Sequence, residues 1–168
     1  MQDALNAHLA DELASSYLYL AMAADCEARN LPGFAHWLRT QSDEERGHAM
    51  KFFDFVQSRG WPVKLHGLDA PPGDFGSPLQ LFERALAAER EVTNKINQLY
   101  AAASEVEDYA SQAFLQWFVS EQVEEEKTAS GIVETLRMIG DDKVALLVLD
   151  RELAGRAARA GLPSAVAD

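Results

Sequence analysis

The sequence contains a single cysteine, few basic residues and no long run of apolar residues. Because Cys26 has no second cysteine to pair with, an internal disulfide and a metal site built from cysteine pairs are both excluded. The apolar runs, residues 144–149 among them, are all far shorter than the roughly 18 residues that a membrane-spanning helix needs. The first residues are polar and amphipathic, unlike a secretory leader. These absences predict a cytoplasmic protein with no membrane partner.

The shortage of basic residues also restricts the partners of the protein. The 168 residues include 15 Lys and Arg against 27 Asp and Glu, which gives a net charge of −12. Such a chain repels nucleic acid, because proteins bind nucleic acid by neutralising its phosphates with Lys and Arg. We therefore expect no nucleic-acid partner. An acidic surface attracts cations, although acidity by itself usually serves only solubility.

Strand signals are nearly absent and helical periodicity is almost continuous, which predicts an all-α fold with a single domain over residues 1–155. Residues 156–168 are expected to form a mobile C-terminal tail. Four long helices and a short fifth helix are predicted at about residues 3–29, 33–59, 78–104, 108–139 and 141–153.

The lengths of the connections predict how the long helices are arranged. Brief turns near residues 31 and 106 favour two antiparallel helix pairs. Residues 60–78 hold four prolines and four glycines, so this connection is not helical. At about 3.3 Å per residue it can span the whole length of a long helix, which rises only about 1.5 Å per residue. The prediction is a four-helix bundle with one long crossover between the second and third helices.

Each long helix interrupts its apolar stripe with polar residues near the middle of its length. A misread helical phase could explain one such interruption, but it explains four poorly. The interrupting residues that carry carboxylate, amide or imidazole groups are Glu12 on the first helix, Gln41, Glu45 and His48 on the second, Glu89 on the third, and Gln122 and Glu125 on the fourth.

These residues also lie at similar heights along the bundle. Counted from the first turn, Glu12 lies about 19 residues back and His48 about 17 residues forward. Counted from the second turn, Glu89 and Gln122 lie about 17 residues back and about 16 forward. Burying one unpaired carboxylate costs several kcal/mol, and no Lys or Arg occupies the stripes at this height. The carboxylates must therefore share protons or bind metal cations.

Carboxylate oxygens combined with an imidazole suit iron, manganese and related divalent ions. Glu12, Glu45 and His48 would hold one metal ion, because residues three apart, such as Glu45 and His48, lie on one helical face. Glu89 and Glu125 would hold a second ion, with Glu45 bridging the two and Gln122 nearby. The alternative is a purely structural bundle whose buried polar layer shares protons and binds no metal.

At these residues the chain resembles the bacterial-type non-haem ferritins, over about residues 3–155. The resemblance implies a ferritin-like four-helix bundle with a short fifth helix. It also implies an iron-storage protein with ferroxidase activity, which oxidises Fe(II) with dioxygen and deposits ferric mineral inside a hollow shell of 24 chains. A small di-iron peroxidase or oxidase without storage is the alternative activity. The motifs that carry the resemblance are ELASSYLYLAM, EERGHA, AAEREVTNKI and FLQWFVSEQVEEEK.

The resemblance assigns functional roles to individual residues. It implies that Tyr19 acts as an electron donor or a hydrogen-bond partner, whereas the sequence alone equally fits a core tyrosine. Gln122 is expected to be either a ligand or a hydrogen-bond partner of the ligands. The implied ferroxidase centre comprises Glu12, Glu45, His48, Glu89, Gln122 and Glu125. A possible third iron site would use Glu44, Glu121 and Glu124 with Glu125, although these residues also fit an ordinary solvated acidic face.

The implied cofactor is iron in a di-iron centre, and no haem is expected. Haem-containing relatives have Met directly after the second-helix glutamate, where this chain has Arg46, and a second E-x-x-H motif where this chain has Gln122 and Glu125. The implied partners are Fe(II), dioxygen or hydrogen peroxide, and further copies of the chain. One departure concerns the route of iron, because two acidic pore residues of animal ferritins align with Gln112 and Leu115.

Two further expectations concern residues outside this centre. His8, His36 and His66 are expected to be structural or surface residues, without a carboxylate partner at the right spacing. The fifth helix is apolar nearly all round and would expose a hydrophobic patch on an isolated bundle. Its burial is expected to need other subunits.

Overall fold

The computed structural model describes residues 1–155, which form five helices and no strand. The all-α prediction is confirmed, and the helix boundaries agree with the predicted ones to within two residues. The predicted tail, residues 156–168, lies outside the described residues. The helices are α1 (Gln2–Ala28), α2 (Pro32–Ser58), α3 (Pro78–Glu105), α4 (Tyr109–Ile139) and α5 (Lys143–Leu153).

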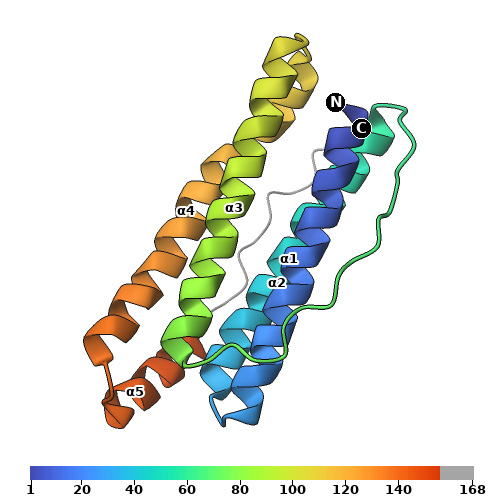
Figure 1. The fold of residues 1–168 in the computed structure, drawn as a ribbon. Helices are drawn as coiled ribbons and strands as arrows, with labels where there is room; N and C mark the ends of the chain where they lie inside the picture. The colour runs from blue at the N-terminus through green and yellow to red at the C-terminus, as the bar shows by residue number, and fades with distance from the viewer. Residues whose placement is uncertain (156–168) are drawn as a thin grey trace.

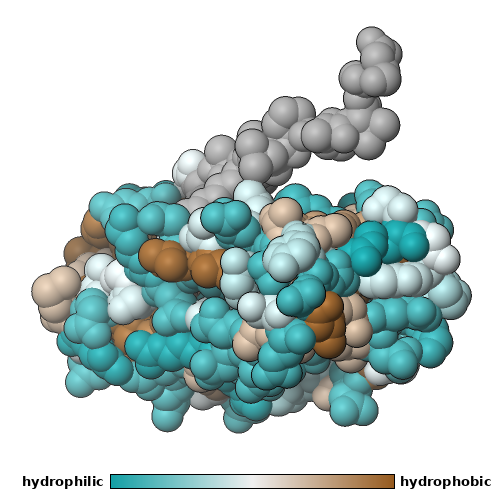
Figure 2. All heavy atoms as spheres, turned by 90° about the horizontal axis from the view of Figure 1, so that it is seen from above, coloured by the Kyte–Doolittle hydropathy of each residue, from teal (hydrophilic) through white to brown (hydrophobic). Residues whose placement is uncertain are grey.

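The long helices form two antiparallel pairs, α1 with α2 and α3 with α4 (Figure 1). The connection from α2 to α3 runs along the bundle from one end to the other, so that α2 and α3 point in the same direction (Figure 1). This is the predicted crossover. Within residues 1–155, none of the helices is both long and apolar enough to cross a membrane. The face drawn in Figure 2 is mostly hydrophilic, with small hydrophobic patches.

Polar side chains fix where the later helices begin. Ser77 and Gln80 form a capping box at the start of α3, with Pro78 in the first turn, as the sequence indicates. The predicted start of the fifth helix at residue 141 is wrong by two residues. Asp142 is the N-cap, because its carboxylate accepts hydrogen bonds from the amides of Val144 and Ala145 at 2.9 and 3.1 Å. The helix therefore begins at Lys143.

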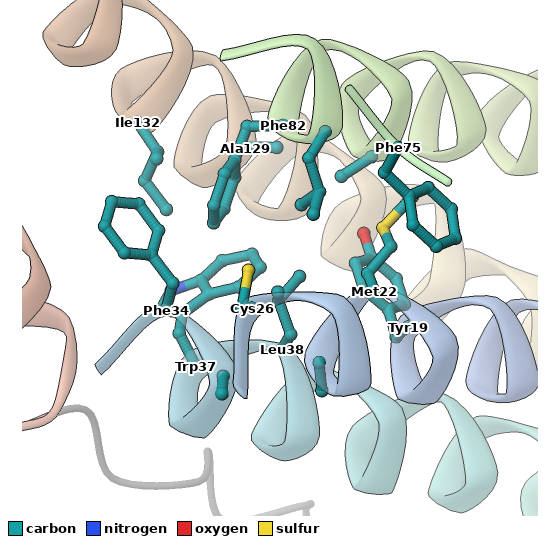
Figure 3. Close-up of a cluster of buried hydrophobic side chains, with 14 of the residues drawn as sticks. Tyr19, Met22, Cys26, Phe34, Trp37, Leu38, Phe75, Phe82, Ala129 and Ile132 are labelled. Carbon is teal, nitrogen blue, oxygen red and sulfur yellow. The ribbon is translucent and has the colours of Figure 1, made fainter. Parts of the chain in front are cut away.

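The crossover is attached to α1 through a buried asparagine. The Asn6 side chain donates a hydrogen bond to the carbonyl of Pro62 at 3.2 Å and accepts one from the amide of Lys64 at 2.8 Å. At the other end of the crossover, Phe75 is buried in the core beside Met22 (Figure 3). The hydrogen bonds of Asn6 satisfy backbone groups of the crossover that would otherwise lack a partner in the protein, and Phe75 anchors its other end.

The apolar core is divided into two clusters, and the interrupting residues of the stripes lie between them. On α1, Leu9 belongs to one cluster and Tyr19 to the other, with Glu12 between. On α3, Glu89 likewise separates Leu86 from Val92. Figure 3 shows part of the cluster that includes Tyr19, where side chains of α1, α2, α3 and α4 meet. The polar layer is therefore closed on both sides by apolar side chains.

Helix α5 packs against the start of α2. The Asp150 carboxylate accepts hydrogen bonds from the amides of Gly33 and Phe34 at 2.9 and 3.0 Å, so a residue of α5 caps α2. A Cβ atom at Gly33 would lie 1.6 Å from the Asp150 carbonyl oxygen, so this position requires glycine. The outer side of α5 leaves Val144 and Leu147 exposed by 73% and 51%.

We predict that Gly33→Ala weakens the docking of α5 and lowers the free energy of unfolding by at least about 2 kcal/mol, through the lost cap and the exposure of Leu149. Gly47→Ala is the matched control in the same helix, since no atom lies within 4 Å of its added Cβ, and it should stabilise by up to about 1 kcal/mol. Chemical denaturation measures both changes. Equal stability of the two variants would contradict the close approach.

Candidate metal centre

The polar residues that interrupt the four stripes face inward. Each is at most 6% exposed, so the prediction that they point into the bundle rather than into water is confirmed. Both neighbouring layers are apolar, which limits water as a solvating partner. The buried set from the predicted ferroxidase centre is Glu12, Glu45, His48, Glu89, Gln122 and Glu125.

Glu12, Glu45 and His48 form the tightest part of this layer. One ligand atom from each lies within 4.8 Å of the others, which makes them the one such group of three found in residues 1–155. His48 Nδ1 lies 3.4 Å from Glu45 Oε2 and 3.9 Å from Glu12 Oε2. The i, i+3 spacing on α2 and the contact between α1 and α2 bring these groups together. Two carboxylates and an imidazole at this spacing could hold a divalent metal ion.

Gln41 connects this group to α4, a role that the sequence did not indicate. Its side-chain nitrogen lies 2.9 Å from Glu125 Oε2 and 3.3 Å from Glu45 Oε1, so one amide donates to carboxylates of two helices. Gln41 is fully buried, one turn before Glu45 in the α2 stripe. That position was visible in the sequence, but the partner on α4 lies 84 residues away in the chain.

Glu89 is surrounded by hydrogen-bond donors from α1 and α4. The Tyr19 hydroxyl donates to one of its carboxylate oxygens, and Gln122 Nε2 lies 3.3 Å from the other. The same Gln122 nitrogen also donates to the backbone carbonyl of Glu89 at 3.1 Å. In this structure Tyr19 and Gln122 are thus hydrogen-bond partners of Glu89, one of the two roles expected for each.

Burial and mutual repulsion keep protons on this layer. Burial, with the negative charges of Glu89 and Glu12, holds the pKa of Glu45 well above its usual value. Burial also raises the pKa of Glu89 to about 7, although the hydrogen bonds from Tyr19 and Gln122 oppose the rise. Glu12 behaves differently: burial raises its pKa, but the hydrogen bond from His8 and nearby positive charge outweigh burial and lower it overall. Without a cation, the carboxylates therefore differ in protonation.

His48 is held as a neutral ring. Burial lowers its pKa, against the opposing effect of Glu12. The ring meets Trp117 and Phe118 edge-on, with centroids 5.4 and 5.8 Å away. A neutral imidazole is the form that binds metal, because its free nitrogen keeps a lone pair.

The residues of the possible third iron site lie less close together than Glu12, Glu45 and His48 do. Glu44 and Glu121 are half-buried, and both act electrostatically on His48. Glu124 is half exposed, and its carboxylate lies 3.5 Å from the ammonium of Lys127. Within residues 1–155, these three glutamates do not form a ligand group of the kind seen around His48. The structure therefore does not bring the third set together.

One expectation about an individual residue needs correction. His8 is buried, and its Nε2 atom lies 2.9 Å from Glu12 Oε1, so the prediction that it lacks a carboxylate partner is wrong. The i, i+4 spacing of His8 and Glu12 on one helix was the signal for this contact. Leu115, which aligns with an acidic pore residue of animal ferritins, is fully buried in an apolar cluster. His36 and His66 are exposed, as expected.

Comparison with known proteins agrees with this geometry. The profile of the family described as "Ferritin-like domain" matches residues 2–139. The bacterial non-heme ferritin of Bacteroides fragilis is 40% identical over 156 residues, covering 93% of this chain and 97% of the relative. That of Staphylococcus saprophyticus is 39% identical over 154 residues, covering 92% of each chain.

Solved structures extend the similarity to three dimensions. An open pore ferritin from the archaeon Archaeoglobus fulgidus superposes with a TM-score of 0.93 at 49% identity, covering 94% of this chain and 97% of that one. An engineered closed form of the same archaeal ferritin gives a TM-score of 0.93 at 48% identity, covering 95% and 97%. With its fold, its buried Glu–Glu–His group and these matches, the chain belongs to the ferritin family of iron-storage proteins.

Proposed function

We propose that the protein is a ferroxidase that takes Fe(II) as its substrate, oxidises it with dioxygen in pairs at the buried layer, and stores the ferric product as mineral inside a shell of 24 chains. The observation that carries this proposal is the buried Glu12–Glu45–His48 group. Within residues 1–155, neither Glu12 nor Glu45 is paired with Lys or Arg, so a bound cation is the natural counter-charge.

Two positions for iron are proposed, and the Glu12–Glu45–His48 group supports the first. Glu12, Glu45 and His48 would bind one Fe(II), and Glu89 and Glu125 a second, with Glu45 between them. The negative charges of Glu89, Glu12 and Glu125 all raise the pKa of Glu45, which supports its central place.

The hydrogen-bond donors around the layer fix the orientation of its carboxylates. Gln41 donates to Glu45 and Glu125, and Gln122 and Tyr19 donate to Glu89. Held in place by these bonds, the carboxylates need little rearrangement to accept cations. We therefore assign Gln41, Gln122 and Tyr19 to orienting the carboxylates.

The reaction would need two electrons from two Fe(II) ions. Each iron gives up one electron, and dioxygen accepts both together with two protons to form hydrogen peroxide. The protein holds the two ions close together in a site closed to bulk water, so the electrons reach one oxygen molecule. Protons displaced from Glu45 and Glu89 when cations bind are available in the same layer.

The storage part of the proposal rests on the family and on the surface of α5. The similar proteins are named ferritins, and one of them is described as having an open pore. The exposed apolar side chains of α5, Val144, Leu147 and Val148, are suited to contact with neighbouring chains. A third iron position at Glu44, Glu121 and Glu124, and a cytoplasmic location, stay predictions.

We predict that Glu45→Ala removes rapid Fe(II) oxidation, because it deletes the carboxylate shared by both positions. The initial rate of ferric absorbance should fall by at least about 100-fold, beyond the 10- to 100-fold typical of residues that only hydrogen-bond to a ligand. Asp54→Ala, an exposed carboxylate on the same helix, is the control and should oxidise Fe(II) at the wild-type rate. Indistinguishable rates for wild type and Glu45→Ala would end the ferroxidase proposal.

Glu89 binds its proton more tightly in the folded protein than as a free group. The stability of the metal-free protein should therefore depend on pH. Glu89 has a pKa of about 7 in the folded protein against 4.5 for the free group, so the folded form binds more protons between these values. Stability should therefore fall as pH rises from about 4.5 to 7, by on the order of 3 kcal/mol from Glu89. His48 acts in the opposite direction because its pKa is lowered.

Comparison with Glu89→Gln isolates the glutamate contribution, since the amide does not titrate. Denaturant unfolding of metal-free wild type and Glu89→Gln at pH 5 and pH 7.5 measures it. The variant should lose less stability than wild type over this interval. Parallel pH profiles would show that Glu89 titrates normally and that the layer is not closed to water.

The storage shell predicts a large particle. Twenty-four chains of 18.5 kDa would give a mass of about 440 kDa, whereas a small di-iron peroxidase or oxidase would run as a monomer or dimer. Size-exclusion chromatography with light scattering distinguishes these masses. A stable monomer or dimer with active Fe(II) oxidation would favour the enzyme without storage.

A further inference from the structure

His8 is a buried histidine outside the predicted ligand set, in direct contact with a member of that set. Its side chain is 2% exposed, and its ring packs against Phe52 with centroids 4.7 Å apart. Nε2 lies 2.9 Å from Glu12 Oε1, and Nδ1 lies 3.7 Å from the carboxylate of Asp11 at the edge of the bundle. The ring is therefore held between an aromatic face and two acidic residues.

The two oxygens of Glu12 have different surroundings. Oε1 is bonded to His8, whereas Oε2 is buried and has no hydrogen-bond donor among residues 1–155 other than the carboxyl group of Glu45 when that group is protonated. Oε2 is also the oxygen on the side of His48, 3.9 Å from its Nδ1. A buried carboxylate oxygen without a donor is costly unless it meets a cation or a shared proton. Oε2 is thus the oxygen that is suited to iron.

The direction of the His8 hydrogen bond follows from the chemistry of the ligand. A carboxylate that binds a metal is ionised and can only accept hydrogen bonds. The hydrogen between His8 and Glu12 must then sit on Nε2 of His8. With that hydrogen in place, Nε2 has no lone pair to give to iron, while it still fixes the rotation of the carboxylate.

We propose that His8 is a positioning residue for Glu12: it holds Oε1 so that Glu12 presents Oε2 alone to Fe(II), beside Glu45 and His48. This inference rests on the proposed function of the centre. Binding through one oxygen, rather than two, would leave the Fe(II) held by Glu12, Glu45 and His48 accessible to dioxygen. Hydrogen-bond partners of metal ligands commonly have such an orienting role.

The test compares His8→Leu, which removes the donor but retains a side chain of moderate size, with His8→Gln, which retains an N–H donor. The probe is Co(II) under anaerobic conditions, because Co(II) binds carboxylate and imidazole ligands and is not oxidised under these conditions. Its visible absorption becomes weaker as the coordination number rises. Asp54→Ala, a substitution at an exposed carboxylate, is the control and should give the wild-type affinity and cobalt spectrum.

We expect His8→Leu to bind the first Co(II) about 10- to 100-fold more weakly than wild type. We also expect a less intense cobalt spectrum, because a freed Glu12 can bind through both oxygens. His8→Gln should restore the wild-type spectrum and most of the affinity. A purely structural role of His8 would change the unfolding temperature but would leave the cobalt spectrum of the folded protein unchanged.

Two results would overturn the inference while leaving the proposed function intact. In the first, wild type and His8→Leu bind Co(II) with equal affinity and identical spectra. In the second, X-ray absorption at the cobalt edge shows one imidazole fewer in both His8 variants, which would make His8 a ligand. If wild type and Glu45→Ala both fail to bind Co(II), the proposed function fails, and the role of His8 fails with it.

Discussion

The burial of several carboxylates in one layer is the constraint on which the rest of the structure depends. Glu12, Glu45, Glu89 and Glu125 come from four different helices, and apolar clusters enclose them on both sides. A layer of this kind is stable only when protons or cations offset the charge. The four-helix bundle can provide such a layer because long, nearly parallel helices bring residues of equal height together from distant parts of the chain.

The hydrogen bonds around the layer give its carboxylates unequal roles. Burial and like charge favour the protonated form of Glu45, whereas His8 favours the ionised form of Glu12. A cation that arrives at this side therefore meets a carboxylate that is already charged, next to one that must release a proton. Binding and proton release are then linked within one contact between α1 and α2. The amide of Gln41 extends this contact to α4.

The sequence predicted the fold and the buried polar layer because both depend on helical periodicity and on counting from the turns. Contacts between distant segments were less visible. Gln41 stood in the predicted stripe, yet its link to Glu125 depends on how α2 packs against α4. Asp150 caps a helix that begins more than a hundred residues earlier, and no local pattern indicates this. His8 is a different case, because its i, i+4 spacing to Glu12 is visible in the sequence and indicates the contact.

The close fit between Gly33 and Asp150 has a consequence for the order of events in assembly. The backbone amides at the start of α2 fix the fifth helix in place, and in that position Val144 and Leu147 form an exposed apolar ridge. A chain whose bundle is still open at that end offers no ordered ridge to its neighbours. If copies of the chain associate through α5, as proposed, the docking of α5 on α2 must therefore come before association.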